Sequence, residues 1–413
     1  MRGSVLTRKT LQSKVHGSSQ RDLLDEVINA YHQGRMIADW EGSHLLKGKK
    51  PHPDDFTFTS NDYLAISNHP HLINCQIKAL KNFGNGLLQS SVFQQAEDYQ
   101  LKLEQRFSQF LGVEDCLLSQ SGWNANTGLI QTIANHQTPV YIDIHAHMSL
   151  WQGIRLARAK AIPFQHNSPR ALIQRLERYG SGIIVVDSIY STLGSIAPLK
   201  EYCRLAKQYN CILIVDESHS LGTHGANGKG LLETLNLVNE VDFITASLAK
   251  AFSSRAGIIF SNHKAIECLR YSLYPSIFSS ALLPQDLACL EASLDLIEHE
   301  QWRRNKLHAN HHYLRKKLLE LDLYLANSQS QIIPLLCGSE TNAKLLRDYL
   351  EDKKIFGSVF CWPATSKNGT LIRLSINSNH EIETLDYLAS ILSTLKQKLK
   401  NLNFPLIPSA HIG

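Results

Sequence analysis

The sequence predicts an α/β protein built around a parallel or mixed sheet. Short apolar runs, typical of buried strands, alternate along the chain with helical patterns of hydrophobic residues. The runs occupy residues 116–118, 140–142, 183–186, 212–215, 241–244 and 257–260. Strands that are apolar throughout indicate a sheet covered by helices on both faces. Ligands of such sheets bind beyond the carboxyl ends of the strands, and Asp143, Asp187 and Asp216 each follow a run there.

Composition describes an ordinary globular protein of two or three domains. The chain has 413 residues, 43% of them hydrophobic and 19% charged, with a net charge of +5. This small positive excess is too weak to indicate nucleic-acid binding, although it favours anionic small molecules. The eight cysteines are scattered without a C-x-x-C pair, which predicts reduced thiols in a reducing compartment.

The N-terminal part predicts an arm followed by helices. Residues 1–20 are polar and basic, without the apolar stretch of a secretory signal. Hydrophobic residues recur at helical spacing over 21–42, and an amphipathic helix is expected over 100–111. There is no run of 18 or more apolar residues, so we expect no membrane span and a cytoplasmic location.

The C-terminal part predicts a smaller α+β unit. A long helical pattern begins near residue 287 and continues through 298–317. Candidate strands follow at 331–336, 357–361 and 370–376, and a closing helix is expected over 381–399. We therefore predict an arm and helix over 1–55, a large domain over 56–290 and a small domain over 291–413.

An acid and an amine mark the most informative pair of strand ends. Asp216 follows the run at 212–215, and Lys250 follows the run at 241–244. A carboxylate beside a ring nitrogen and a lysine beside an aldehyde are what pyridoxal phosphate requires of a protein. Taken alone, Asp216 could equally cap the next helix, and Lys250 could be an ordinary solvated lysine. Hydroxyls of Ser247, Ser253 and Ser254 surround Lys250 in sequence and would suit a phosphate.

Other candidate groups follow neighbouring strands. The turn at 119–126 contains Gly122 and precedes a helical stretch, which suits an anion, although such turns are common. His145 and His147 could bind a metal, but we predict no metal site because no third ligand is evident, and an imidazole stacked on a flat ring is a better use of His147. Ser191 and His219 could donate to a ring oxygen or simply stabilise their own turns.

Arg373 lies in an apolar C-terminal strand. A planar guanidinium there could bind an α-carboxylate through two hydrogen bonds, whereas a surface strand arginine is the alternative.

In combination these residues resemble the fold-type I pyridoxal-phosphate enzymes, specifically the α-oxoamine synthase family. The resemblance covers about residues 55–400 and rests on an ordered set of motifs: SNDYL at 60–64, NHP at 68–70, HMS at 147–149, IAPL at 196–199, DESHSLG at 216–222, SLAK at 247–250, FSS at 278–280 and IR at 372–373. Further wording at 118–126, 186–194 and 356–361 is similar to the autoinducer synthases that make long-chain α-hydroxyketone signals.

The resemblance implies a role for each matching residue. Lys250 would hold the cofactor aldehyde, Asp216 would face the ring nitrogen, and His147 would stack on the ring. Ser191 and His219 would lie near the ring oxygen. Phosphate contacts would come from Ser121, Gly122, Trp123 and Ser247, with Ser280 reaching the phosphate of a neighbouring subunit. The substrate would be bound by Asn61, Tyr63 and Arg373, with Asn61 and Arg373 holding its carboxylate.

The resemblance also implies a fold and a reaction. We expect a large domain with a mostly parallel seven-stranded sheet, a smaller C-terminal α+β domain and a homodimer. The expected reaction joins a fatty acyl-CoA to a small amino-acid-derived substrate, of the 2-aminobutyrate or S-adenosylmethionine type, with loss of CO₂. Alternatives are a synthase that uses glycine or alanine with a short acyl-CoA, and a catalytically silent subunit of the same fold.

Two departures from the family pattern carry a further expectation. The glycine-rich stretch usual before the first large-domain helix reads GNGLLQSSVF at 84–93, and glycines usual beside the lysine are replaced by Ala249, Ala251 and Phe252. We expect these replacements to give a bulkier and more apolar wall near the substrate.

Overall fold

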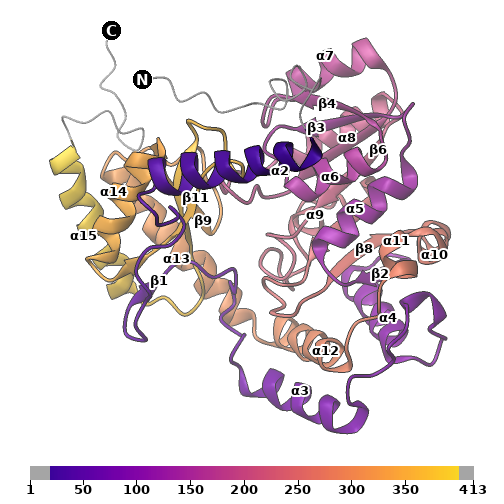
Figure 1. Cartoon of the computed structure of the whole chain (residues 1–413). Helices are drawn as coiled ribbons and strands as arrows, with labels where there is room; N and C mark the ends of the chain where they lie inside the picture. The colour runs from indigo at the N-terminus through magenta and orange to yellow at the C-terminus, as the bar shows by residue number, and fades with distance from the viewer. Residues whose placement is uncertain (1–18, 400–413) are drawn as a thin grey trace.

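The computed structural model describes residues 19–399 and contains the predicted large sheet (Figure 1). Its strand order is β2-β8-β7-β6-β5-β3-β4. Only β8 runs antiparallel to its neighbours, β2 and β7, so the sheet is mostly parallel, as expected. The strands are β2 (Asp115–Ser119), β3 (Pro139–Asp143), β4 (Lys160–Phe164), β5 (Ile183–Asp187), β6 (Ile212–Asp216), β7 (Phe243–Ser247) and β8 (Gly257–Ser261).

Each of the six apolar runs forms a strand, whereas β4 has no matching run. It lies at the edge of the sheet, pairs only with β3, and exposes Lys160 and Pro163. An edge strand is half open to solvent and tolerates proline, so it lacks the continuous apolar signal of the central strands.

Helices cover both faces of the sheet with separate hydrophobic clusters. One cluster joins the sheet to α3 (Pro70–Phe83), α4 (Tyr99–Leu111), α7 (Pro169–Tyr179), α8 (Leu199–Gln208) and α12 (Pro284–His299). The other joins it to α5 (Gly122–Ile133), α6 (Met148–Leu156) and α10 (His263–Ser272). The sheet is therefore buried on both faces, and the ends of its strands are left as the place for a ligand.

A second core forms the C-terminal domain, drawn in orange and yellow in Figure 1. Its antiparallel sheet has the order β11-β12-β9, and its helices are α13 (Gln301–Glu320), α14 (Glu340–Glu351) and α15 (Ile382–Leu399). The strands β9 (Ile332–Gly338), β11 (Ser358–Phe360) and β12 (Thr370–Ser375) differ from the predicted bounds by one or two residues.

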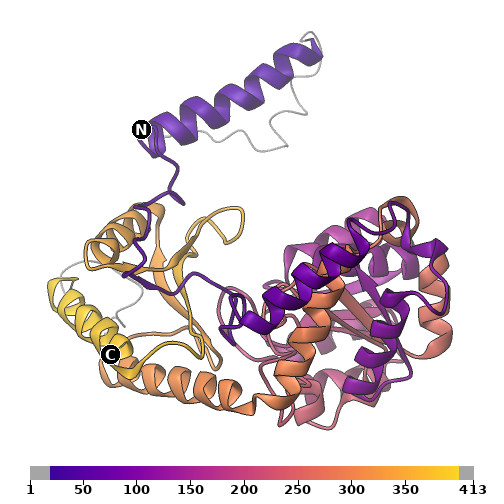
Figure 2. The same cartoon turned by 90° about the horizontal axis from the view of Figure 1, so that it is seen from below.

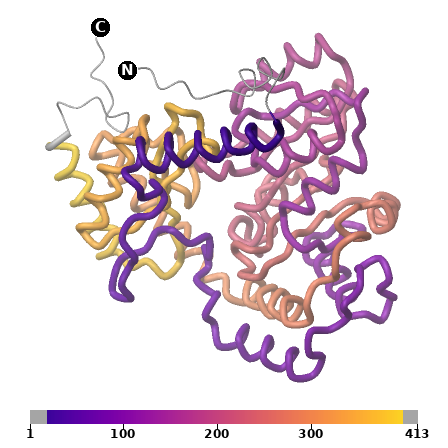
Figure 3. Tube along the Cα trace, viewed as in Figure 1, coloured from indigo at the N-terminus to yellow at the C-terminus, as the bar shows by residue number. Residues whose placement is uncertain are grey.

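The structure favours domain boundaries a few residues later than the predicted 55/56 and 290/291. The strand β1 (Phe56–Thr57) pairs with β10 (Ile355–Phe356), and Phe58 packs in the C-terminal core. The helix α12 continues through residue 290, and the chain breaks only at Glu300 before α13. We propose boundaries near residues 59 and 300; Figure 3 follows the chain from the first of these to α3 on the large domain.

An N-terminal arm precedes β1. The helix α2 (Gln20–Asn29) begins with a capping box between Ser19 and Asp22 and continues as the π-helix η1 (Ala30–Asp39). None of the side chains in these two segments is buried, and Figure 2 shows them projecting away from both domains. The helix predicted over 21–42 is therefore present but ends at Asp39, and it leaves Leu24, Val27, Ile28, Tyr31 and Ile37 exposed in a single chain.

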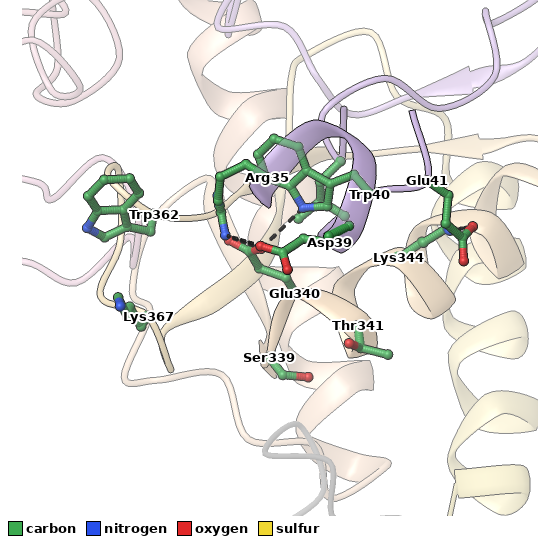
Figure 4. A pocket seen from close by; sticks show the side chains of 12 residues that line it. Arg35, Asp39, Trp40, Glu41, Ser339, Glu340, Thr341, Lys344, Trp362 and Lys367 are labelled. Carbon is green, nitrogen blue, oxygen red and sulfur yellow. Dashed lines mark hydrogen bonds and ion pairs between the residues drawn. The ribbon is translucent and has the colours of Figure 1, made fainter. Parts of the chain in front are cut away.

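The base of the arm is fixed to the C-terminal domain around a cavity of about 550 Å³ (Figure 4). Arg35 donates to both carboxylate oxygens of Glu340, at 2.8 and 3.0 Å, and its guanidinium lies over the Trp40 ring. The Trp40 indole donates to the same carboxylate. Because Arg35 and Trp40 both donate to Glu340, the cluster serves as an anchor for the arm.

Across residues 19–399, no helix combines the length and the hydrophobicity needed to cross a membrane. All eight cysteines are free thiols, and five of them are buried, as Cys116 and Cys337 illustrate.

Candidate active site

Two adjoining cavities lie at the carboxyl ends of the large-sheet strands. The smaller, of about 240 Å³, is lined by Ser121, Gly122, Trp123, Asn126, His147, Asp187, Asp216, Ser218, His219, Ser247 and Lys250. The larger, of about 670 Å³, extends towards the C-terminal domain, where Phe360, residues 363–366 and Arg373 complete its wall. His147, His219 and Lys250 line both cavities, so these three side chains stand where the two spaces meet.

Asp216 ends β6 and is buried in the smaller cavity. One of its oxygens accepts the Ser218 backbone N–H at 2.8 Å, and the other accepts the Asn126 side-chain amide at 2.7 Å. Two donors of this kind fix the orientation of the carboxylate. The alternative of a plain helix cap is therefore wrong, because no helix follows directly and the second donor comes from α5.

A hydrogen-bond chain links Asp216 to His147. The Asn126 amide also donates to Ser149 Oγ at 2.9 Å, and Ser149 Oγ lies 2.7 Å from His147 Nδ1. Since the Ser149 backbone N–H also donates to Nδ1, this nitrogen is an acceptor and the proton of the neutral ring sits on Nε2. Burial lowers the pKa of His147, which favours this neutral form.

Sequence reasoning did not assign roles to Asn126, Ser149 or Asp187. Asp187 ends β5 beside Asp216, and its carboxylate accepts the His147 backbone N–H at 3.2 and 3.3 Å. Burial, followed by the charge of Asp216, raises the pKa of Asp187 well above its usual range. The position of Asp187 at a strand end was a usable signal, whereas nothing in the sequence placed Asn126 opposite Asp216.

Lys250 follows β7, and its side-chain amine has a lowered pKa. Burial lowers its pKa to about 8, and the nearby positive charge of Arg373 acts in the same direction, while Asp216 opposes the shift. Lys250 lines both cavities, so it is not the solvated surface lysine of the alternative interpretation. A lysine of this pKa is partly neutral near pH 8 and can then act as a nucleophile or a base.

His219 is fully enclosed beside Lys250. Its Nδ1 lies 2.7 Å from the Tyr63 hydroxyl, and Gln331 donates to its backbone carbonyl at 2.8 Å. Burial, with the nearby positive charges of Lys250 and Arg373, lowers the pKa of His219 well below its usual value. Tyr63 does not line either cavity; it supports His219 from behind.

The start of α5 forms the far end of the smaller cavity. Ser121 caps the helix by accepting the Asn124 N–H, which leaves the N–H groups of Gly122 and Trp123 for an anion. A Cβ at Gly122 would lie 2.6 Å from the Cβ of Ser247, so only glycine permits this approach of β7 to the helix. Ser121, Gly122, Trp123 and Ser247 thus lie together around one space.

Arg373 lies in β12 and reaches across to the larger cavity. It donates to the Ser191 backbone carbonyl at 2.9 Å and to the Asn61 side-chain oxygen at 2.8 Å. Both acceptors are neutral groups, and the buried Arg373 Nε has no hydrogen-bond partner among the described residues. The surface alternative is wrong, because Arg373 is only 5% exposed and lies over the Phe360 ring. This guanidinium can accept a carboxylate.

The apolar part of the larger cavity does not come from the replaced glycines. Ala251 and Phe252 belong to the core of the large domain, and Phe252 packs on Phe107. In the 84–93 segment Phe93 is 66% exposed. Neither segment lines the cavities in this chain, so that expectation is corrected. The wall is instead formed by Ile144, Met148, Trp151, Phe360, Pro363 and Ala364.

Three predicted hydroxyls lie outside the two cavities. Ser253 donates to Asp62, and Ser254 donates to the Asp286 backbone carbonyl, so these two are not phosphate ligands here. The Ser280 backbone carbonyl accepts from Gln120 at 2.6 Å beside the start of α5. The predicted contact of Ser280 with a neighbouring subunit requires a second copy and stays a prediction.

The donor set of the smaller cavity fits pyridoxal phosphate. A carboxylate, an amine of lowered pKa and a helix N-terminus approached through a close glycine contact surround one space, with an imidazole at its edge. These are the groups needed for a ring nitrogen, an aldehyde, a phosphate and a flat ring face.

Comparison with known proteins supports this assignment. Residues 53–392 match the model of the family described as aminotransferase class I and II. The chain is 45% identical to the CAI-1 autoinducer synthase of Vibrio campbellii, over 87% of this chain and 92% of the relative. It is 32% identical to the 8-amino-7-oxononanoate synthase of Petrotoga mobilis, over 89% of this chain and 94% of the relative.

Solved structures show the same fold. A serine palmitoyltransferase from S. paucimobilis superimposes with a TM-score of 0.84 at 25% identity, covering 93% of this chain and 100% of that one. Family match, identity and site geometry lead to one conclusion: the chain belongs to the aminotransferase class I and II family and is a pyridoxal-phosphate-dependent acyltransferase of the oxoamine synthase type.

Proposed function

We propose that the enzyme joins a fatty acyl-CoA to a small α-amino acid with loss of CO₂, giving a long-chain aminoketone or enaminone that is later converted into an α-hydroxyketone autoinducer. The observation that carries this proposal is the lining of the larger cavity, which combines Lys250, the guanidinium of Arg373 and apolar side chains such as Ile144, Met148 and Trp151. The guanidinium suits a carboxylate, and the apolar side chains suit an alkyl chain. The relative with 45% identity is an autoinducer synthase.

In this proposal the smaller cavity holds the cofactor. Lys250 would hold its aldehyde, Asp216 its ring nitrogen and His147 one ring face, with Ser191 and His219 near the ring oxygen. Ser121, Gly122, Trp123 and Ser247 would surround the phosphate. When bound, pyridoxal phosphate supplies an electron sink for bonds broken at the α-carbon of the amino acid.

Three residues of the chain would have separate chemical roles around the cofactor. Asp216 is fixed by Asn126 and Ser218. Its carboxylate would stabilise the positive charge of the protonated ring nitrogen of the cofactor. Lys250, with a pKa of about 8, takes the α-proton when neutral and returns it when protonated. Neutral His147 can lie against a ring without adding a positive charge beside Lys250.

Arg373 would hold the carboxylate of the amino substrate, with Asn61 fixing the guanidinium. Tyr63 would act through His219. The cavity size is compatible with a substrate of the 2-aminobutyrate or the S-adenosylmethionine type. For the acyl donor, Ile144, Met148 and Trp151 offer apolar surface on one side of the cavity, where burial of each CH₂ contributes about 0.8 kcal/mol.

We further propose a homodimer and a cytoplasmic location. Phe278 is 75% exposed beside Ser280, and the arm leaves Leu24, Val27 and Ile28 uncovered, which suits burial against a second copy. Free cysteines throughout the chain suit a reducing compartment. No nucleic-acid partner is proposed, since the net charge is only +5.

The experiment that tests the proposal assays purified enzyme with 2-aminobutyrate or S-adenosylmethionine and acyl-CoA donors of graded length. We expect CoA release and a decarboxylated product, identified by mass spectrometry, with kcat/KM highest for medium or long acyl chains. Preference for acetyl- or succinyl-CoA with glycine or alanine would favour a biosynthetic oxoamine synthase. Failure to develop a visible cofactor band would indicate a silent subunit.

A further inference from the structure

A hydrogen-bonded row of three side chains, in which Asp143 and Ser195 are buried and His166 is 18% exposed, lies next to His145 in the lining of the larger cavity. His166 Nδ1 lies 2.9 Å from an oxygen of Asp143, and His166 Nε2 lies 2.8 Å from Ser195 Oγ. Asp143 also accepts the backbone N–H groups of His145 at 2.8 Å and Asn167 at 2.9 Å. With two such donors it is a carboxylate, so Nδ1–H of His166 donates to it and Nε2 accepts from Ser195.

Asp143, His166 and Ser195 follow one another in the order of a nucleophilic triad, yet these three residues do not form a hydrolytic site. Ser195 is only 3% exposed, and neither Ser195 nor His166 lines the cavities. The His166 ring is enclosed by the rings of His145 and Tyr190, at centroid distances of 4.7 and 4.4 Å. A substrate cannot reach the Ser195 hydroxyl, so the three residues can only position the segments that they contact.

Those segments are two loops that face the substrate. Asp143 ends β3 and holds the turn that carries His145 and His147. Ser195 closes the turn at 189–196, in which its carbonyl accepts the Tyr190 N–H at 3.1 Å and Ile189 pairs with Ile196. That turn carries Ser191, whose carbonyl holds Arg373 at 2.9 Å. His166 is therefore the bridge between the two loops.

We propose that His166, oriented by Asp143, is a positioning residue that fixes the Ser191 turn relative to the His147 turn, and so sets the place of Arg373. Asn167 strengthens the bridge, because its side chain donates to the Ile196 carbonyl at 2.9 Å. The proposal rests on the proposed function only in that Arg373 is taken to bind the substrate carboxylate and Ser191 to lie beside the cofactor.

The variants that test it are His166→Phe, His166→Asn, Ser195→Ala and the double variant of His166→Phe with Ser195→Ala. A matched control is His263→Phe, because His263 Nδ1 also lies 2.9 Å from a carboxylate, that of Asp115, but its side chain is 71% exposed and far from the cavities in the fold. Each apoenzyme is titrated with pyridoxal phosphate by absorbance, and each holoenzyme with 2-aminobutyrate. Thermal unfolding is recorded in parallel.

We expect His166→Phe to raise both half-saturation concentrations roughly tenfold, about the worth of one or two hydrogen bonds, while the KM for acyl-CoA stays unchanged. His166→Asn should recover part of the loss, because its amide can still donate to Asp143. The double variant should be no worse than His166→Phe, since both changes break one bridge.

Wild-type titrations with a lowered Tm would overturn the proposal and leave His166 a merely structural residue. Additive losses in the double variant, or an equal rise in the KM for acyl-CoA, would do the same. The cofactor titration needs no turnover, so it decides the matter even if the enzyme uses another amino acid. If the wild-type holoenzyme does not bind 2-aminobutyrate but the variants shift the cofactor titration as expected, only the proposed substrate is contradicted.

Discussion

Two groups of histidines in this chain have lowered pKa values, but their neighbouring groups differ. His147 and His219 stand where the two cavities meet, beside Lys250. His308 and His311 lie on α13 and pack on each other, and His308 also packs against His224 in the loop after β6. Burial is the first cause of the lowered pKa in all of them. A lowered pKa therefore marks enclosure, and only the neighbouring groups mark a site.

The hydrogen bonds of the α13 group explain why it is structural. His308 Nε2 lies 2.8 Å from the Thr223 backbone carbonyl, which can only accept, so that nitrogen carries the proton. His308 Nδ1 then accepts from His311 Nε2 at 3.1 Å, and the buried His311 Nδ1 is left without a partner among the described residues. These histidines hold α13 against the loop that carries His219.

The largest effect expected at the cavity group is that of Asp216→Asn. Replacing the carboxylate removes the charge that faces the cofactor, and kcat should fall at least about 100-fold, as for the loss of other preorganised electrostatic groups. Steady-state assays with the preferred acyl-CoA measure this. The control is Glu217→Gln at the next residue, a buried acid that caps α9 (Leu231–Thr234) through the Leu231 and Leu232 N–H groups and should keep near-normal turnover. Equal losses in both variants would contradict the assignment.

Arg373→Lys should give a smaller and more selective effect. A lysine keeps the charge but cannot reach Ser191, Asn61 and a carboxylate at once. We expect the KM of the amino substrate to rise about 10- to 100-fold, with a modest change in the KM of acyl-CoA. Kinetics with each substrate varied in turn separate the two. A rise confined to acyl-CoA would place Arg373 at the wrong substrate.

The smallest effect on turnover is expected for His311→Gln, whose amide can still donate to His308. Folding lowers the pKa of His311 to about 2, so the unfolded chain binds the proton first as the pH falls. Stability from this residue is present above pH 6.5 and is lost progressively below it, by up to about 1.4 kcal/mol per pH unit. Urea unfolding at pH 7 and pH 5 should show a smaller loss in the variant. An unchanged loss would mean that His311 does not titrate on unfolding.

The sequence predicts the strands and most of the residues that line the two cavities, because both leave local signals. The central strands are apolar throughout, and the polar residues that follow them had to meet at one edge of the sheet. It missed β4, whose edge position allows Lys160 and Pro163, and it missed the Asn126 bridge, which joins α5 to β6 across 90 residues of sequence. It also misplaced Phe252, because the chain turns back after Lys250 with Ser253 at a φ of 50° and buries that ring in the core.

The central claim is that Lys250, between Asp216 and Arg373, carries both the cofactor and the reaction. Its most direct test is to titrate apoenzyme and its Lys250→Ala variant with pyridoxal phosphate, and to assay both for product. The wild type should develop a visible absorbance band, faster as the pH rises through about 8 because the neutral amine is the reactive form. The variant should lack the Schiff-base band, as distinct from the absorbance of free pyridoxal phosphate, and should give no product. Turnover retained by Lys250→Ala would contradict the account.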